Sequence, residues 1–110
     1  MKTVRTRSQE YSERAWQYYP PDKKGNDEFV SRARSFPSLL HNSGLAQAVA
    51  FVLGKDEKDF VGYLEKVLNV NSLYEQARKA PLREYMLLSR KVMLAATWIK
   101  RTVDAREGGN

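Results

Sequence analysis

Basic side chains are the residues of this sequence that are best suited to form a binding site. The chain has 19 Lys and Arg residues against 13 Asp and Glu residues, which gives a formal net charge of +6. Residues 1–54 carry +3, residues 55–71 carry −1 and residues 72–110 carry +4. Positive charge at both ends of a chain favours a polyanionic partner such as RNA or DNA. The alternative is a charged surface that only keeps the protein in solution.

Two groups of cations are candidate phosphate ligands. The first group is Arg78, Lys79, Arg83 and Arg90, and the second is Arg32, Arg34, Lys23 and Lys24. Contacts to the backbone of a nucleic acid require Lys and Arg on rigid elements rather than a set of side chains that reads bases. The sequence therefore predicts RNA binding by the whole first group, which we favour, and by Arg32 and Arg34. An ordinary solvated face is the alternative for each of these residues.

Residues suited to catalysis are few. The chain has no cysteine, which excludes a thiolate nucleophile, and its one histidine, His41, precedes a predicted turn, where it is more typical of a local capping partner. Grouped carboxylates occur at 27–28 and 56–59, but each group lies where a helix is predicted to start, and capping explains it. No nucleophile-elbow, Walker or dinucleotide-binding pattern is present. The sequence predicts a protein that is not an enzyme and has no metal site and no cofactor.

The longest helical pattern, at 85–101, is the element around which the others should pack. At about 100° per residue its apolar positions gather on one side of the helix. They are Tyr85, Leu88, Val92, Ala95, Ala96, Ile99 and Val103. The opposite side carries Arg83, Arg90 and Arg101, flanked by Leu87, Leu94 and Trp98. A helix that is apolar over more than half of its circumference either lies inside a core or has a second surface to cover.

The rest of the chain predicts an all-α fold, a compact bundle of about six helices in a single domain over residues 1–110. Helices are expected at 7–19, 27–40, 45–53, 57–68 and 73–80 and after Pro81. No segment alternates between apolar and polar residues with a period of two, so no strand is expected. Asp27 and Asp56 are the expected N-caps, and Pro37 should kink or divide the second helix. Residues 1–6 could form a flexible basic arm, and 106–110 a flexible tail.

Hydrophobic residues predict where the chain is buried and in which compartment it works. Trp16 and Trp98 have apolar neighbours, which favours a place in the core over stacking on bases. Phe51 belongs to a short, nearly apolar segment that should also be buried. The apolar runs are too short to span a bilayer, and the N-terminus has no apolar signal-peptide segment. We therefore expect a cytoplasmic protein without a membrane contact.

Two sequence motifs are similar to the signature of a known protein family. They are SerGlyLeuAlaGlnAlaValAlaPheVal, from Ser43 to Val52, and TrpIleLysArg, from Trp98 to Arg101. Together they are similar to the signature of the small helical subunit of type III-B CRISPR effector complexes, the fifth protein family of the Cmr (RAMP) module. Arg14 and Ala15 in the first helix lie where that family carries an Arg-Ala pair. The resemblance covers nearly the whole chain, in order and at similar spacing.

The resemblance implies a six-helix protein without catalytic activity. In that family it stacks, as more than one copy, along the RAMP-type backbone of a ribonucleoprotein for antiviral defence. The stack helps line the groove in which guide RNA pairs with target RNA, and another subunit cleaves the target. By this resemblance the partners are the other subunits, guide RNA and target RNA, and Leu87 and Leu94 are the candidate subunit contacts.

Two other functions are compatible with the sequence. One is a stand-alone basic helical regulator that binds DNA, because a turn with glycine precedes a helix at 41–51, although that helix is too apolar to read a major groove. The other is a helical protein–protein adaptor that uses Leu87, Leu94 and Trp98 as its contact surface.

Overall fold

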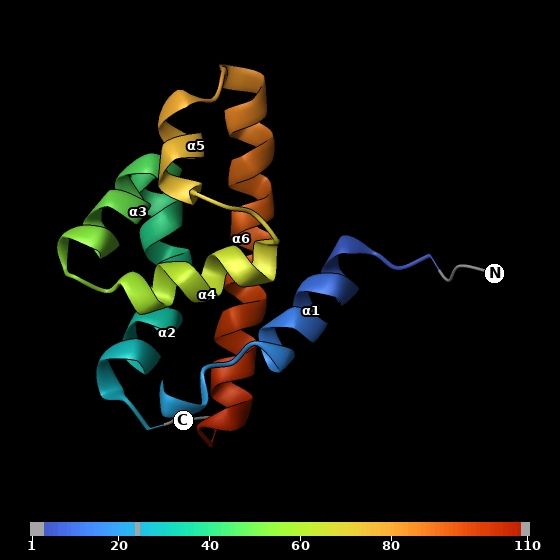
Figure 1. Cartoon of the computed structure of the whole chain (residues 1–110), viewed down its shortest axis with the longest axis vertical. Helices are drawn as coiled ribbons and strands as arrows, with labels where there is room; N and C mark the ends of the chain where they lie inside the picture. The colour runs from blue at the N-terminus through green and yellow to red at the C-terminus, as the bar shows by residue number, and fades with distance from the viewer. Residues whose placement is uncertain (1–3, 24, 109–110) are drawn as a thin grey trace.

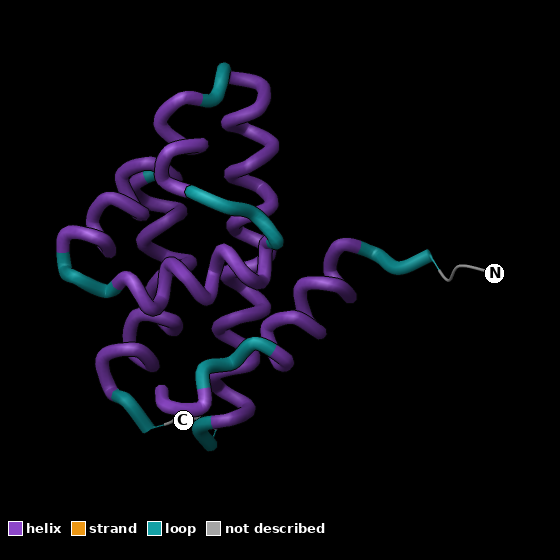
Figure 2. Tube along the Cα trace, in the orientation of Figure 1, coloured by secondary structure: helices purple, strands orange, loops and turns teal. Residues whose placement is uncertain are grey.

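The computed structural model describes residues 4–23 and 25–108, and within these residues it contains helices and no strand (Figures 1 and 2). The α-helices are α1 (Arg7–Gln17), α2 (Asp27–Ser43), α3 (Leu45–Gly54), α4 (Lys58–Leu68), α5 (Leu73–Lys79) and α6 (Leu82–Arg106). A short 3₁₀ helix, η1 (Pro21–Lys23), lies in the loop after α1. The predicted all-α bundle of six helices is confirmed. No helix in the described residues has the length and apolar character that crossing a membrane requires.

The helix starts differ from the prediction at two places. Asn26, not Asp27, is the N-cap of α2, and its side-chain oxygen accepts a hydrogen bond from the Phe29 amide at 2.9 Å. At α4 the N-cap is Glu57, without a side-chain cap bond, while Asp56 adopts a left-handed conformation with φ 60°. Asp and Asn both suit an N-cap, so spacing alone places a cap only to within about one residue.

The connection from α2 to α3 is tighter than predicted. The α2 helix continues through Pro37 to Ser43, so the proline does not divide it. Pro37 removes one backbone donor, but Phe36 and Leu40 on either side of it are buried in the core and hold the helix in place. Gly44 is the only residue between the two helices, and its φ of 82° favours glycine.

The core forms around one side of α6, which contacts α1, α2 and α4 (Figure 1). The side chains of Val92, Ala95, Ala96, Ile99 and Val103 are fully buried, as predicted. Tyr85 and Leu88, nearer the start of α6, are only half-buried and pack against the edge of the core. The predicted core face of this helix is therefore confirmed over its C-terminal two thirds.

Aromatic rings in the core join α2 and α4 to the segment that follows α1. Tyr19, Phe29, Phe60 and Tyr63 are buried, and their rings meet at 5.8 to 6.1 Å between centroids. The Tyr63 hydroxyl donates a hydrogen bond to the Ala15 carbonyl. Burial raises the pKa of Tyr63, so this hydroxyl keeps the proton that it donates.

Two aromatic residues that the sequence assigns to buried segments, Trp16 and Phe51, are exposed instead, and so is Tyr18 in the helix expected at 7–19. Trp16 is 54% exposed, Phe51 46% and Tyr18 42%. The prediction that Trp16 lies in the core is wrong. Trp16 is turned by about 100° around the helix axis from Ala15, which faces the core, so its side chain leaves the buried face of α1. Tyr18 lies past the end of α1, where the helical period no longer applies.

Val92→Asp should unfold the protein, because it places a charge without a partner at a fully buried position of α6. We expect a loss of more than about 4 kcal/mol from the free energy of unfolding. Met86→Asp is the matched control on the same helix, since Met86 is 48% exposed. Circular dichroism during thermal unfolding would measure both variants, and a Val92→Asp protein as stable as Met86→Asp would contradict the packing described here.

Candidate nucleic-acid interface

The outer side of α6 carries a stripe of arginines, Arg83, Arg90 and Arg101, which point in nearly one direction at about 100° per residue. All three are exposed. Within residues 4–23 and 25–108 none of them is paired with a carboxylate. We call these three residues the arginine stripe. A guanidinium presents several N–H donors that match phosphate oxygens and remains charged at any physiological pH.

The predicted subunit contacts lie along this stripe but differ in exposure. Leu87 is 49% exposed, whereas Leu94 is half-buried and packs against the core. Leu82 and Met86, which precede Leu87 in the first turns of α6, are also exposed, at 75% and 48%. The start of α6 therefore offers more apolar surface to a partner than its middle does.

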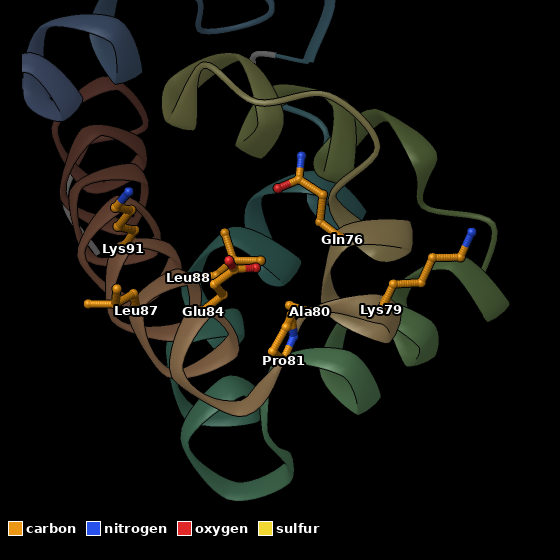
Figure 3. A pocket seen from close by; sticks show the side chains of 8 residues that line it. All are labelled: Gln76, Lys79, Ala80, Pro81, Glu84, Leu87, Leu88 and Lys91. Atoms are coloured by element: carbon orange, nitrogen blue, oxygen red, sulfur yellow. The ribbon is translucent and has the colours of Figure 1, made fainter.

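A hollow of about 410 Å³ lies between the end of α5 and the start of α6 (Figure 3). It is lined by Gln76, Lys79, Ala80, Pro81, Glu84, Leu87, Leu88 and Lys91. Lys79 extends from α5 on one side of the hollow and Lys91 from α6 on the other (Figure 3). The structure thus brings Lys79, a predicted RNA-binding residue, and Leu87, a predicted contact residue, to one hollow with a cation on each side.

Arg78 and Lys79, in the last turn of α5, both lie near Glu75. Their side-chain nitrogens are 3.3 Å and 3.6 Å from its carboxylate oxygens. The Arg78 guanidinium also lies over the Tyr74 ring, 5.4 Å from its centroid. Exposed pairs of this kind contribute only about 0–1 kcal/mol, so a phosphate can replace Glu75 at little cost.

Arg32 and Arg34 do not form a cluster, because they point from α2 to different neighbours. The Arg32 Nε is 2.6 Å from Glu57, and the Arg32 side chain is only 15% exposed. The Arg34 Nε is 2.8 Å from Asp104 near the end of α6. Both arginines link α2 to other parts of the fold, and their RNA-binding role stays a prediction.

Lys23, the described cation of the second group outside α2, lies at the end of η1. The Lys23 ammonium is 2.7 Å from Asp59, and this hydrogen bond raises the pKa of Lys23. Lys24 lies outside the described residues. Lys23 and Arg32 line one small hollow, but each is paired with a carboxylate, and Arg34 does not line it. The described cations of the second group therefore do not form one site.

The sequence analysis missed a second hollow, of about 690 Å³, between α1 and the C-terminal half of α6. It is lined by Ser12, Glu13, Trp16, Gln17, Trp98, Arg101, Thr102 and Ala105. We call it the tryptophan groove. A helical projection of α1 could have indicated it, because Trp16 lies about 140° from Tyr11 and so leaves the buried face. Within the described residues no group of His, Cys, Asp or Glu could hold a metal ion.

Comparisons with known proteins decide the family. Residues 7–106 match the family described as CRISPR-associated protein (Cas_Cmr5). The chain belongs to this family. The Cmr5 subunit of the CRISPR Cmr system from Thermus thermophilus is 35% identical over an alignment of 114 residues. The alignment covers 93% of this chain and 96% of that protein. The predicted resemblance to the small helical Cmr subunit is confirmed.

The fold of this Cmr5 family chain also matches a crystal structure. A CRISPR-associated Cmr5 family protein from Thermus thermophilus superimposes with a TM-score of 0.84 at 35% sequence identity. The match covers 94% of this chain and 98% of the crystallised one. The six-helix arrangement therefore belongs to the family and is not peculiar to this sequence.

Replacing Arg32 should destabilise the protein more than replacing Arg83. Arg32→Ala removes a charged hydrogen bond and leaves the half-buried Glu57 carboxylate without its partner, which should cost about 2 kcal/mol. Arg83→Ala changes an exposed residue, and we expect less than about 0.5 kcal/mol. Urea unfolding of both variants measures the difference. Equal losses would show that Arg83 is part of the stabilising network.

Proposed function

We propose that this protein is a non-catalytic small subunit of a type III-B CRISPR effector complex, which is guided by RNA and targets RNA in antiviral defence. In the cytoplasm it stacks along the backbone of the complex and helps line the groove that holds guide and target RNA. The observation that carries the proposal is the family match over residues 7–106, together with an arginine stripe that has no carboxylate partner among the described residues.

The arginine stripe supports a role in holding RNA. Arg83 and Arg90 are exposed on one rigid helix of 25 residues, so their spacing is set before RNA binds. Contacts to phosphates supply most of the affinity of a protein that binds RNA without reading its sequence. Because phosphates repeat regularly along the RNA backbone, cations arranged in a line suit them better than a pocket that reads bases. Guanidiniums hold phosphate but do not exchange protons at neutral pH, so they suit positioning rather than catalysis. In this proposal another subunit cleaves the target.

The apolar residues beside the stripe support a contact with a neighbouring subunit. Leu82, Met86 and Leu87 are all about half exposed or more at the start of α6. Leu94 contributes less, because it already packs against the core. A neighbour that covers the first three would bury apolar surface and place the stripe at the edge of the interface, next to RNA.

Purification from the host tests the proposal as a whole. A tagged copy of the full chain, recovered under gentle conditions, should bring with it RAMP-type backbone subunits and a guide RNA. Recovery of the protein alone, or with unrelated proteins, would refute the proposal. A tight, sequence-selective shift of one DNA duplex in a gel would favour the regulator instead, and a partner that binds equally well at high salt would favour the adaptor.

Charge reversal of Arg83 and Arg90 should weaken RNA binding by the assembled complex. We expect a loss of about tenfold or more, and a fall of about 2 in the slope of log affinity against log salt, one for each phosphate contact. The isolated double variant, Arg83→Glu with Arg90→Glu, should keep its melting temperature, because both residues are exposed.

The matched control changes the same amount of charge on another helix. Lys58→Glu with Lys66→Glu alters two exposed lysines of α4. This variant should bind RNA nearly as well as the unchanged complex. An equal loss of affinity in both double variants would mean that net charge, and not the arginine stripe, is responsible.

A further inference from the structure

We propose that the tryptophan groove is a stacking site for bases of single-stranded RNA, with Trp16 and Trp98 as the stacking surfaces. This inference rests on the proposed function and names the part of the RNA that the subunit would bind beyond the duplex phosphates. The groove lies where α1 runs beside the C-terminal half of α6 (Figure 1). Its volume of about 690 Å³ is within the range of sites that hold small molecules, about 300–1,000 Å³.

Trp16 is an exposed ring that is held in position. Its side chain is 54% exposed, the largest exposure of any aromatic residue described. The Arg106 guanidinium lies 4.2 Å from the Trp16 ring centroid and donates a hydrogen bond of 2.9 Å to the Trp16 carbonyl. Arg106 therefore supports the ring from the protein side, and more than half of the indole surface is left for a ligand.

Trp98, across the groove, is half-buried and packs against the core, as predicted in part, and the remaining part of its ring lines the groove. Its one polar atom, Nε1, donates a hydrogen bond of 2.6 Å to the Ser8 hydroxyl. The Arg101 guanidinium lies 4.9 Å from the Trp98 ring centroid. With its donor already used, the indole can stack on a base but cannot select one by hydrogen bonding. Such stacking tolerates any sequence, which suits a subunit that must accept every guide.

The charge of the groove favours a nucleic acid over a peptide. Its one carboxylate, Glu13, is already paired with Arg5. Among the described residues, neither Arg101 nor Arg106 has a carboxylate within 4.0 Å. Arg101 is the cation that lines the groove, beside the Trp98 ring. Arg106 lies behind the Trp16 ring and is not part of the lining. A guanidinium without a carboxylate partner next to aromatic rings matches the phosphates and bases of a single strand.

The position of the groove fits a strand that follows α6. Arg101 belongs both to the arginine stripe and to the groove, and Trp98 lies one turn before it. A strand whose phosphates contact Arg83 and Arg90 would reach the groove at the C-terminal half of the same helix. Its bases could then turn away from the backbone and enter between α1 and α6.

The test uses the purified full-length chain and an oligoadenylate of about 10 nucleotides, a length within the usual site size for single strands. Trp16 and Trp98 are the only tryptophans, so all indole fluorescence comes from the groove. Titration with oligoadenylate should quench this emission, whereas an abasic oligomer of equal length, which keeps the phosphates, should not. Equal quenching by both oligomers, or none by oligoadenylate, would overturn the proposal.

Substitutions then locate the stacking. Trp16→Ala should weaken binding of labelled oligoadenylate about tenfold, measured by anisotropy, and Trp16→Phe should restore part of the loss. The matched control is Phe51→Ala, because Phe51 is also an exposed ring, with Arg32 and Lys55 over it at 5.3 Å and 5.4 Å. Phe51→Ala should change binding less than about twofold. Normal binding by Trp16→Ala, or equal losses for the two alanine variants, would refute the groove.

The assembled complex separates this inference from the proposed function. If Trp16→Ala blocks assembly but leaves oligoadenylate binding intact, the groove holds a neighbouring protein and the RNA inference fails. If the variant assembles and both the complex and the isolated chain bind RNA normally, the inference fails while the proposed function stands. If the unchanged chain never co-purifies with backbone subunits, the proposed function fails whatever Trp16 does.

Discussion

Burial of one side of α6 is the constraint on which the rest of the structure depends. This helix has 25 residues and is therefore about 37 Å long, enough to reach α1, α2 and α4 with a single face. Val92, Ile99 and Val103 on that face are fully buried, so the helix cannot rotate without exposing them. The side opposite is consequently held outward, and its residues are available to partners without a loss of core packing.

The candidate arginines of α2 and those of α6 differ in their surroundings. Arg32 and Arg34 are partly buried, and each has a carboxylate within 2.8 Å, because a guanidinium that loses water needs a partner. Arg83 and Arg90 remain in water and have no such requirement. A phosphate that bound Arg32 would have to displace Glu57 from a half-buried site, whereas one that bound Arg83 would displace only solvent. Burial therefore separates Arg32 and Arg34, which link parts of the fold, from Arg83 and Arg90, which are available to bind RNA phosphates.

The C-terminal end of α6, with its C-cap residue Glu107, holds the first helix and the loop after it. Glu107 accepts hydrogen bonds from the Tyr19 hydroxyl at 2.9 Å and from the Gly25 amide at 3.0 Å, and Arg106 contacts Trp16. Burial and the hydrogen bond to Glu107 raise the pKa of Tyr19, so its hydroxyl remains a donor. These contacts fix α1 against α6 and so determine the width of the tryptophan groove between them.

The sequence alone determined the all-α class, the main helices, the buried face of α6 and the family, because these follow from local periodicity, Gly and Pro positions and short motifs. It placed two N-caps one residue away from their true positions, and it assigned Trp16 to the core. Only the tertiary structure decided which cations are paired, since Arg34 meets Asp104 from 70 residues away and Arg32 meets Glu57 from 25. It also brought Trp16 to Trp98 across a groove, and Ser8 to Trp98 from 90 residues away. Contacts over such separations depend on how helices pack, and a helical period carries information only about the face of one helix at a time.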